Sequence, residues 1–492
     1  MLDRLPYTGA LETSSRRLLI GGELVSGAAE EMPLTSPVDG SSLGSVPVAD
    51  AGLVADAVDA ASRAFPGWSA THVRERQAAV LALAQHLFDD LPNLVALEAV
   101  DGGLPVTAAA NDVRLAATFI RYLAGLAFEW GGRTVPSAAK SFDITVRKPY
   151  GPTARIVPFN HPILFATWKI AGPLLTGNTV VLKLPDQAPL SGLRICTALR
   201  EIFPAGVVNV LTGPGQITGD ALIHHPGIKR IAFIGSVPTG RRILAAAAER
   251  NVPVTAELGG KNAHIIAADA DLEWAVRASV AGMNYQGAGQ SCGSYSRVLA
   301  QDSVYEEFVE RLAAATAAVQ VGNPLADSTT MGPLIAPPPV SRALAAIADA
   351  TQAHATVVAG GTVPEVSGGA GGYYLAPTVV ADVSPVMKIA QEELFAPVQA
   401  VMKWSTVEEA IEIANGTEFG LVASVHTRSL STAMKLADEL EVGSVAVNGD
   451  GGQHWMGAPF GGVKASGVGG KEDTVDELLE STYEKNVFVN FG

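Results

Sequence analysis

Residues 257–262 read Glu257-Leu258-Gly259-Gly260-Lys261-Asn262, and residues 289–292 read Gly289-Gln290-Ser291-Cys292. The first of these stretches marks a boundary in the chain, because one series of short apolar runs and helical segments lies before it and another follows. They also carry chemistry. A thiolate is a strong nucleophile, flanking glycines allow close approach, and a nearby carboxylate can accept a proton from a thiol or a water. Glu257 and Cys292 are therefore candidates for covalent thiol catalysis, with a buried apolar role as the alternative for any single cysteine.

The sequence before Glu257 predicts a buried parallel sheet. Short apolar, β-branched runs alternate with helical segments, at residues 153–158, 179–184, 207–211 and 230–233. Parallel strands joined by crossover helices require this alternation. Helical spacing also occurs earlier in the chain, over residues 50–65, 78–88 and 113–127.

A second series of strands and helices follows Glu257. Its apolar runs cover residues 263–266, 298–300 and 421–425. We therefore place a domain junction near Glu257 and the end of the second sheet near Val447.

Two segments fit neither sheet, namely residues 131–150 and 481–491. Both show the partial polar-apolar alternation of strands with one exposed face. Val487, Val489 and Phe491 would share one side of the second segment, although Phe488 breaks the pattern. The segments predict either an arm that pairs with a neighbouring subunit or an ordinary surface hairpin, and the need to cover strand edges favours the arm.

Composition excludes several classes of protein. The chain has 492 residues, of which 48% are hydrophobic and 17% charged, so we expect two or three globular domains rather than a disordered chain. The net charge of −15, without clusters of Lys and Arg, argues against a nucleic-acid partner. The longest apolar stretch, residues 163–175, contains Lys169 and is too short to span a bilayer, so we expect no membrane partner.

Cysteine usage indicates a reducing compartment. Only Cys196 and Cys292 occur, which excludes a disulfide framework and fits a cytoplasmic location. Cys196 lies in residues 190–199, where helical apolar spacing predicts a core position. Residues 1–15 show no signal-peptide pattern.

Several further motifs follow one another along the chain: Pro158-Phe159-Asn160-His161-Pro162, Gly177-Asn178-Thr179-Val180-Val181-Leu182-Lys183, Phe233-Ile234-Gly235-Ser236 running to Gly240, Glu392-Glu393-Leu394-Phe395-Ala396-Pro397-Val398, and Pro459-Phe460-Gly461-Gly462-Val463-Lys464 with Ser466-Gly467. With the two catalytic stretches in their place, this order resembles the aldehyde dehydrogenase superfamily over nearly the whole chain. Several motifs in one order make a chance match very improbable.

The resemblance implies an α/β fold with three parts: a Rossmann-type NAD-binding domain, an α/β catalytic domain and a β oligomerisation arm. It assigns the NAD-binding domain to residues 1–130 and 151–256, the catalytic domain to 257–447, the arm to 131–150 and 481–491, and an active-site and C-terminal connecting segment to 448–480. A homodimer or homotetramer is the expected assembly.

The resemblance also assigns the chemistry. Cys292 would attack an aldehyde to give a thiohemiacetal, whose collapse expels a hydride to a nicotinamide and leaves a thioester. Asn160, together with the backbone N–H of Cys292, would stabilise the oxyanion, and the alternative for Asn160 is a turn residue before Pro162. Glu257 would activate the water that hydrolyses the thioester, as in the hydrolytic branch of the superfamily. We expect no metal ion.

Cofactor residues are carried over from the same motifs. They are Ile156, Pro158, Phe159, Lys183, Asp186, Gly215, Gly219, Phe233, Gly235, Ser236, Gly240, Leu258, Gly259, Glu393 and Phe395. Lys183 and Asp186 would hold the adenosine ribose, and Glu393 the nicotinamide ribose, although a lone Glu is usually a solvated charge. Many NAD-preferring members have Glu where this chain has Asp186, and a shorter carboxylate still repels a 2′-phosphate. The expected cofactor is therefore NAD, with NADP as the alternative.

The resemblance places a largely apolar and aromatic set of residues around the substrate: Phe119, Phe159, Ile163, Trp168, Tyr285, Ser291, Gly293, His454 and Trp455. The small-molecule substrate is thus expected to be an apolar or aromatic aldehyde. The alternatives are a semialdehyde dehydrogenase and a non-catalytic structural or ligand-binding protein, with ester hydrolysis as a side activity. Two departures from the family pattern are Ala396, where many members have Gly, and Gly470, where Arg is frequent.

Overall fold

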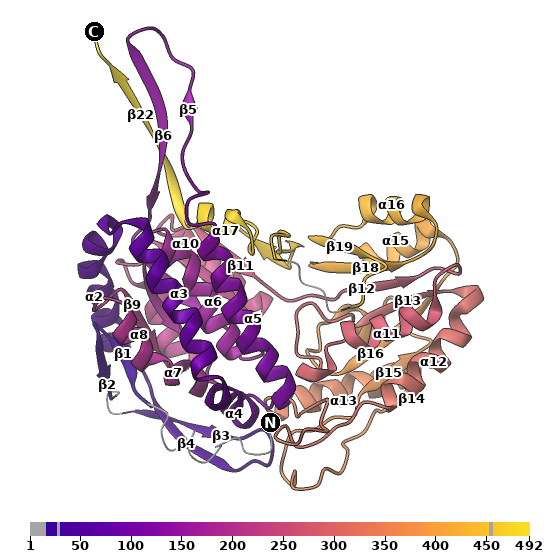
Figure 1. Cartoon of the computed structure of the whole chain (residues 1–492). Coiled ribbons are helices and arrows are strands. Elements are labelled where there is room, and N and C mark those ends of the chain that lie inside the picture. The colour runs from indigo at the N-terminus through magenta and orange to yellow at the C-terminus, as the bar shows by residue number, and fades with distance from the viewer. Residues whose placement is uncertain (1–15, 27–29, 452–455) are drawn as a thin grey trace.

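The computed structural model describes residues 16–26, 30–451 and 456–492. These residues form two sheet-centred halves and a narrow arm that projects from the first half (Figure 1). Each half has a sheet between layers of helices, which is the α/β organisation that the alternating runs predicted.

The sheet of the first half has the order β2-β1-β9-β8-β7-β10-β11-β21 among the described residues. Its strands are β1 (Leu18–Ile20), β2 (Glu23–Val25), β7 (Pro152–Ile156), β8 (Thr179–Lys183), β9 (Val208–Leu211), β10 (Arg230–Ile234), β11 (Val254–Glu257) and β21 (Gly467–Val468). The strands from β9 to β11 are parallel, whereas β1 and β21 pair antiparallel to them. The chain moves outward from β7 to β9 and then returns to β10 on the other side of β7. Ligands of such sheets bind at the carboxyl ends of the strands, where the order reverses.

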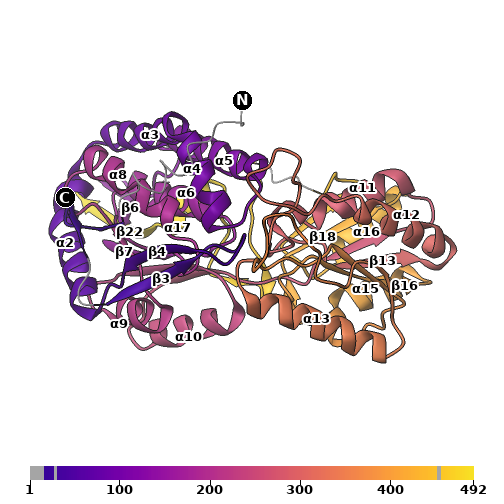
Figure 2. The same cartoon turned by 90° about the horizontal axis from the view of Figure 1, so that it is seen from below.

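Helices cover both faces of this sheet (Figure 2). One face packs against α2 (Ala51–Ala70), α9 (Asp220–His224) and α10 (Val237–Ala248). The other packs against α3 (Val73–Asp89), α4 (Leu91–Asp101), α5 (Val106–Gly125), α6 (Pro162–Leu175), α7 (Leu190–Arg194) and α8 (Cys196–Ile202). The predicted helical stretch over residues 190–199 is thus two helices, because the regular helix is interrupted at Ile195. Cys196 is fully buried, as expected.

The sheet of the second half has the order β14-β15-β16-β13-β12-β18-β19. Its strands are β12 (Ala263–Ile266), β13 (Arg297–Gln301), β14 (Thr356–Ala359), β15 (Thr378–Ala381), β16 (Val398–Trp404), β18 (Val422–His426) and β19 (Ser444–Val447). Every pairing except β14 with β15 is parallel. The predicted end of this sheet near Val447 is confirmed.

Two groups of helices cover the second sheet. One face packs against α11 (Leu272–Gly282) and α12 (Tyr305–Ala317). The other packs against α13 (Pro337–Gln352), α14 (Lys388–Gln391), α15 (Val407–Asn415) and α16 (Leu430–Glu439).

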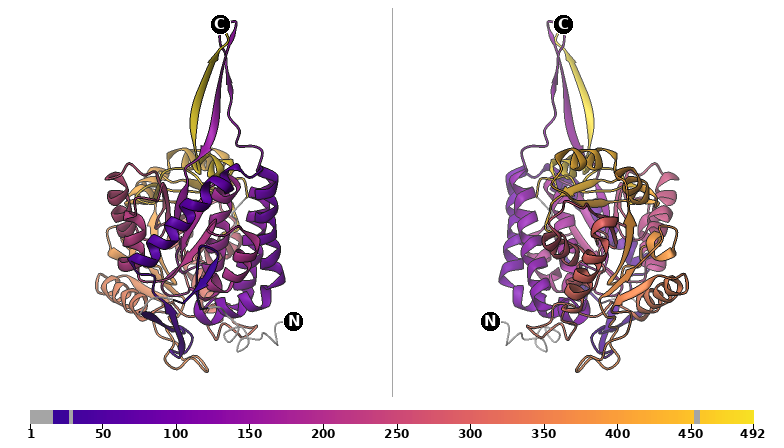
Figure 3. Two further views of the ribbon diagram at one scale, coloured as in Figure 1. Left: turned by 90° about the vertical axis from the view of Figure 1, so that its left-hand side faces the viewer. Right: turned by 90° about the vertical axis from the view of Figure 1, so that its right-hand side faces the viewer.

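The arm is a three-stranded antiparallel sheet that stands clear of the body (Figure 3). It consists of β5 (Thr134–Val135), β6 (Ser141–Pro149) and β22 (Thr482–Asn490), and α17 (Val475–Glu480) leads into β22. β6 pairs with β22 along its whole length. Val487 and Val489 are half-buried, whereas Phe488 and Phe491 are exposed. Phe491, which was predicted to share one side with the two valines, is therefore less buried than they are.

Several elements have no counterpart in the sequence analysis. The hairpin of β3 (Glu31–Thr35) and β4 (Ser42–Pro47) lies near the N-terminus, and a short ladder joins β17 (Phe419–Gly420) to β20 (Val463–Lys464). β21 adds a strand from the predicted connecting segment to the first sheet. Glu257, predicted as the first residue of the second domain, is the last residue of β11 in the first sheet. Of the described helices, none combines the length and apolarity needed to cross a bilayer.

Candidate active site

The carboxyl ends of the parallel strands in the first sheet face the amino ends of the strands in the second sheet. β11 ends at Glu257, and only residues 258–262 separate it from the start of β12. Cys292 lies shortly before β13, and Glu393 lies shortly before β16. Gly260 N–H donates to Glu393 Oε1 over 2.9 Å, and Asn262 Nδ2 donates to the carbonyl of Cys292 over 2.7 Å. These contacts bring together segments that are up to 133 residues apart.

Glu257 is buried without a hydrogen-bond partner. Its side chain is 4% exposed, and within the described ranges neither carboxylate oxygen accepts a hydrogen bond. Burial, followed by the charge of Glu472, raises the pKa of Glu257 well above its ordinary value, against the opposing charges of Lys169 and Lys471. The carboxyl group therefore titrates at higher pH than an exposed Glu.

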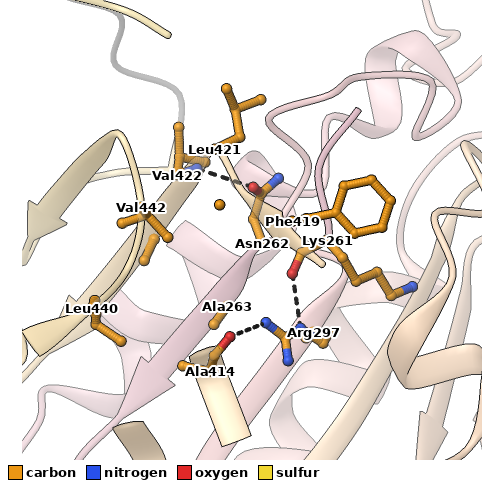
Figure 4. Close-up of a pocket in the computed structure, with 12 residues that line it drawn as sticks. Lys261, Asn262, Ala263, Arg297, Ala414, Phe419, Leu421, Val422, Leu440 and Val442 are labelled. Atoms are coloured by element: carbon orange, nitrogen blue, oxygen red, sulfur yellow. Dashed lines mark hydrogen bonds between the residues drawn. The ribbon is translucent and has the colours of Figure 1, made fainter. Parts of the chain in front are cut away.

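Hydrogen bonds of Asn262 hold the loop that carries Cys292 in place, and we call them the Asn262 clamp. Asn262 Nδ2 also donates to the Ser294 carbonyl over 2.9 Å, while Val422 N–H donates to Asn262 Oδ1 over 3.1 Å. Figure 4 shows the hydrogen bond between Val422 and Asn262. A Cβ on Gly260 would collide with the Cys292 carbonyl, so only glycine permits this approach.

The thiol of Cys292 is half-buried and uncharged at rest. Burial, then the nearby carboxylates of Glu393 and Glu257, raises the pKa of Cys292 to about 12. A thiolate therefore requires that its proton be removed by a base at the moment of reaction.

The small cavity in Figure 4 is lined by residues including Lys261, Asn262 and Arg297. Its volume of about 10 Å³ is too small for an aldehyde. The Arg297 guanidinium donates to the carbonyls of Lys261, Ile413 and Ala414, so Arg297 is structural.

Asn160 stands just beyond the carboxyl end of β7, two residues before α6 begins. It is 8% exposed, and its Oδ1 is buried without a hydrogen-bond partner in the part of the chain that the structure describes. The turn interpretation of Asn160 does not account for a side-chain oxygen that satisfies no turn hydrogen bond.

The predicted cofactor residues follow the carboxyl ends of the parallel strands of the first sheet. Ile156, Pro158 and Phe159 end or follow β7; Lys183 and Asp186 end or follow β8; Gly215 and Gly219 follow β9; Phe233, Gly235, Ser236 and Gly240 end or follow β10; and Leu258 and Gly259 follow β11. The topology therefore gathers residues from five strands along one edge, which no single motif could indicate.

Contacts within this edge join residues from different strands. Lys183 forms an ion pair with Asp186, whose Oδ2 accepts from Gly215 N–H over 3.2 Å. A Cβ on Gly240 would lie 2.6 Å from a methyl carbon of Leu258, so glycine is required there by close packing.

Glu393 and Phe395 reach this edge from the second half. A Cβ on Gly259 would collide with the Glu393 carboxylate, and burial raises the pKa of Glu393 to about 7 despite the hydrogen bond from Gly260. Phe395 adopts a φ of 53° and packs edge-on against Phe159, with ring centroids 5.9 Å apart. Glu393 is therefore not the solvated surface charge that a lone Glu usually is.

Two polar pairs near the site were missed by the sequence analysis. Lys169 on α6 forms a buried ion pair with Glu472 and lies 3.6 Å from Asp473. His161 Nδ1 lies 2.7 Å from Asp112 Oδ2 on α5. The signals were a lysine inside an apolar helix and a histidine beside Asn160, but their partners are distant in sequence.

The expected substrate walls are only partly found. Phe119, Ile163 and Tyr285 are buried in the cores, and Phe119 stacks on Trp168 with centroids 4.2 Å apart. Ser291 and Gly293 are half-buried beside Cys292. His454 and Trp455 lie outside the described residues.

Comparison with known proteins gives one family. The model of the "Aldehyde dehydrogenase family" matches residues 24–487. The chain is 40% identical to aldehyde dehydrogenase tropH of Talaromyces stipitatus, over 93% of this chain and 90% of that protein. It is 36% identical to the putative aldehyde dehydrogenase DhaS of Bacillus subtilis, over 99% and 98%.

Solved structures agree with these relatives. An aldehyde dehydrogenase of Bacillus cereus superposes with a TM-score of 0.95 at 35% identity, covering 99% of each chain. A betaine aldehyde dehydrogenase of Staphylococcus aureus, in complex with NAD+, gives 0.95 at 32% identity over 99% of this chain and 97% of that one.

Proposed function

We propose a function from one premise: the chain belongs to the aldehyde dehydrogenase family. The proposed reaction is the NAD-dependent oxidation of an aldehyde to a carboxylic acid, by the hydrolytic route. The observation that supports it most is the buried carboxyl group of Glu257, which has no hydrogen-bond partner among the described residues. Glu257 ends β11, close to the Cys292 loop that Asn262 holds in place. A thiol enzyme that hydrolyses its own thioester needs such a base.

The carboxyl edge of the first sheet fits a dinucleotide. Lys183 and Asp186 are paired and fixed, and Gly215 N–H is held against them. Glu393 approaches Gly259 so closely that no Cβ fits between them. When bound, NAD accepts the hydride that the aldehyde loses. The NAD complex of the S. aureus relative supports NAD, and NADP is the alternative.

Cys292 begins the reaction by adding its sulfur to the aldehyde carbon, and Glu257 accepts the thiol proton. The carbonyl oxygen gains negative charge, and Asn160 Nδ2 and the Cys292 N–H donate hydrogen bonds to it. In other enzymes one such donor contributes about 3 to 4 kcal/mol. Loss of hydride from the carbon then leaves a thioester on Cys292.

Glu257 acts again when a water replaces the sulfur. Glu257 first releases the thiol proton to solvent, and its carboxylate then accepts a proton from the water as oxygen attacks the thioester carbon. Cys292 leaves as a thiolate, which regains a proton from Glu257. The product is a carboxylic acid. A carboxyl group with a raised pKa suits this role, because a base is most effective when its pKa lies near the working pH.

The proposed substrate is an apolar or aromatic aldehyde. The half-buried rings of Phe159 and Phe165 support it, since an apolar wall gains about 0.8 kcal/mol for each CH2 group that it buries. The alternative is a semialdehyde dehydrogenase. That function would require Arg114 or Arg121 of α5 to pair with the carboxylate of the semialdehyde.

We also propose the three-part division into an NAD-binding domain, a catalytic domain and an arm, and a homodimer or homotetramer formed through the arm. The exposed Phe488 and Phe491 support an arm that is covered by a second subunit. Light scattering at micromolar concentration should give at least a dimer mass, and a monomer would refute this assembly.

An absorbance assay for NADH with a panel of benzaldehyde, hexanal and succinic semialdehyde tests the function. Benzaldehyde and hexanal should give the higher kcat/KM, with an ester substrate run beside them to measure hydrolysis without redox. No NADH from any aldehyde would refute the dehydrogenase assignment and favour a binding protein or an esterase.

A further inference from the structure

The pair of His161 and Asp112 lies directly beside the proposed oxyanion donor. His161 follows Asn160 in the chain and immediately precedes α6, while Asp112 projects from α5. The two side chains are 18% and 13% exposed, so they border the half-buried surface rather than the core. Nothing in the proposed reaction uses this pair.

The geometry of the pair leaves one ring nitrogen free for a ligand. Nδ1 lies 2.7 Å from Asp112 Oδ2, and an ionised carboxylate only accepts, so Nδ1 carries the proton. Among residues 16–26, 30–451 and 456–492, no hydrogen bond is made by Nε2. Asp112 therefore fixes the ring and directs Nε2 away from itself.

Aromatic rings continue from His161 into the core. His161 meets Phe165 edge-on at 5.7 Å, Phe165 stacks on Trp168 at 6.2 Å, and Trp168 stacks on Phe119 at 4.2 Å. His161 and Phe165 are half-buried, whereas Trp168 and Phe119 are buried. A substrate ring held at the outer end of this series would meet one polar atom, Nε2 of His161.

We propose that His161, held by Asp112, determines specificity by hydrogen-bonding a hydroxyl group on the ring of an aromatic aldehyde. The inference rests on the proposed dehydrogenase function and names its substrate class. His161 follows Asn160 directly at the amino end of α6, so a substrate whose aldehyde oxygen meets Asn160 lies beside the segment that carries His161.

A hydroxyl group fits Nε2 in either protonation state. Neutral His161 presents Nε2 as an acceptor, and protonated His161 presents it as a donor. The charge of Asp112 raises the pKa of His161 against the opposing effect of burial. A hydroxyl group donates and accepts, whereas an ether oxygen only accepts and a methyl group does neither.

The experiment compares kcat/KM for benzaldehyde with 3- and 4-hydroxybenzaldehyde, using 3- and 4-methylbenzaldehyde as controls for size. At least one hydroxyl isomer should exceed both benzaldehyde and its methyl analogue by about tenfold or more, the effect of one hydrogen bond to a charged partner. The gain should appear mainly as a lower KM, because the bond forms away from the reacting carbon.

Variants locate the effect. His161→Phe keeps a ring against Phe165 and should reduce the hydroxyl-to-methyl ratio to about one, whereas His161→Gln, which retains a donor and an acceptor, should restore part of it. Asp112→Ala should lower the ratio through KM. His224→Gln, on the exposed helix α9, is the matched control and should keep the wild-type ratio.

Each outcome has a separate meaning. Wild-type protein that oxidises none of these aldehydes contradicts the proposed function itself. Oxidation without a hydroxyl preference, or a preference that persists in His161→Phe, overturns only the role of His161.

Discussion

Charged groups on the two sides of the site differ in one respect. Along the cofactor edge Asp186 is paired with Lys183 and bonded by Gly215, so its charge is satisfied before any ligand arrives. At the proposed reacting centre, neither the Glu257 carboxyl oxygens nor Asn160 Oδ1 has a hydrogen-bond partner among the described residues. An unpaired buried polar group costs about 1 to 3 kcal/mol, so the fold sustains a loss of stability at the centre that it avoids at the edge. Groups that hold a ligand can be preformed, whereas groups that react must remain available.

Substitution of Cys292 should have the largest effect on the reaction. Cys292→Ala should reduce aldehyde oxidation by about 10^4-fold or more, because no other group forms the covalent bond. NAD binding, measured by calorimetry, should stay near the wild-type value because the cofactor edge is untouched. Substantial NADH formation by the pure variant would remove the thiol from the mechanism.

Glu257→Gln should lower turnover by about 10^2- to 10^4-fold, since an amide cannot accept a proton. The raised pKa gives a direction for wild type: the carboxylate form increases with pH over a higher range than for an exposed Glu, so kcat should rise with pH over that range. The variant should lack this rise. Mass spectrometry after mixing with aldehyde and NAD distinguishes an accumulated acyl-enzyme from a failure of thiol activation, and wild-type turnover would contradict both.

Asn160→Ala should lower kcat by about 10^2- to 10^3-fold, the loss measured when a single oxyanion donor is removed elsewhere. Turnover within a few-fold of wild type would return Asn160 to the role of a turn residue.

Asp186→Ser tests the paired side and should have a smaller effect. Removing the carboxylate should shift the ratio of kcat/KM for NAD over NADP towards NADP by about tenfold, or about 1.4 kcal/mol. Native protein that already prefers NADP would contradict our interpretation of this position.

His264 extends the comparison to an unpaired group with no reaction to perform. It is fully buried in the second sheet, stacks on His426 at 4.9 Å, and neither ring nitrogen is hydrogen-bonded within the described chain. Burial, followed by the charge of His426, lowers its pKa, so the unfolded chain binds the proton more readily. The free energy of unfolding should have its full value at pH above the unfolded pKa of about 6.5. At lower pH it should decrease by up to about 1.4 kcal/mol per pH unit. His264→Phe should flatten this dependence of Tm on pH, and an unchanged slope would exclude His264 as its source.

Local patterns predicted more of the fold than of the site's packing. The runs before and after Glu257 correspond to β7 to β10 and to β12, β13 and β18, because buried strands need continuous apolar residues. The order of those strands was not predictable from the runs. β1, β2 and β21 are too short to leave a pattern, and in β3 and β4 the apolar residues are interrupted by polar residues, Gly or Pro. The motifs located Cys292, Glu257 and Asn160 in the sequence. They did not show the Asn262 clamp, the ion pair of Lys169 with Glu472, or the pair of His161 with Asp112, because each depends on contacts between distant segments.

The arm imposes an order on biosynthesis. β6 emerges from the ribosome early, but its partner β22 is translated hundreds of residues later, after both halves of the body. Until then β6 and β5 form at most a hairpin with one open edge, and isolated hairpins are marginal in water. Domains fold as they are made, so the two halves can pack while the arm is still incomplete. Any association through the arm would therefore have to wait until nearly the whole subunit has been made.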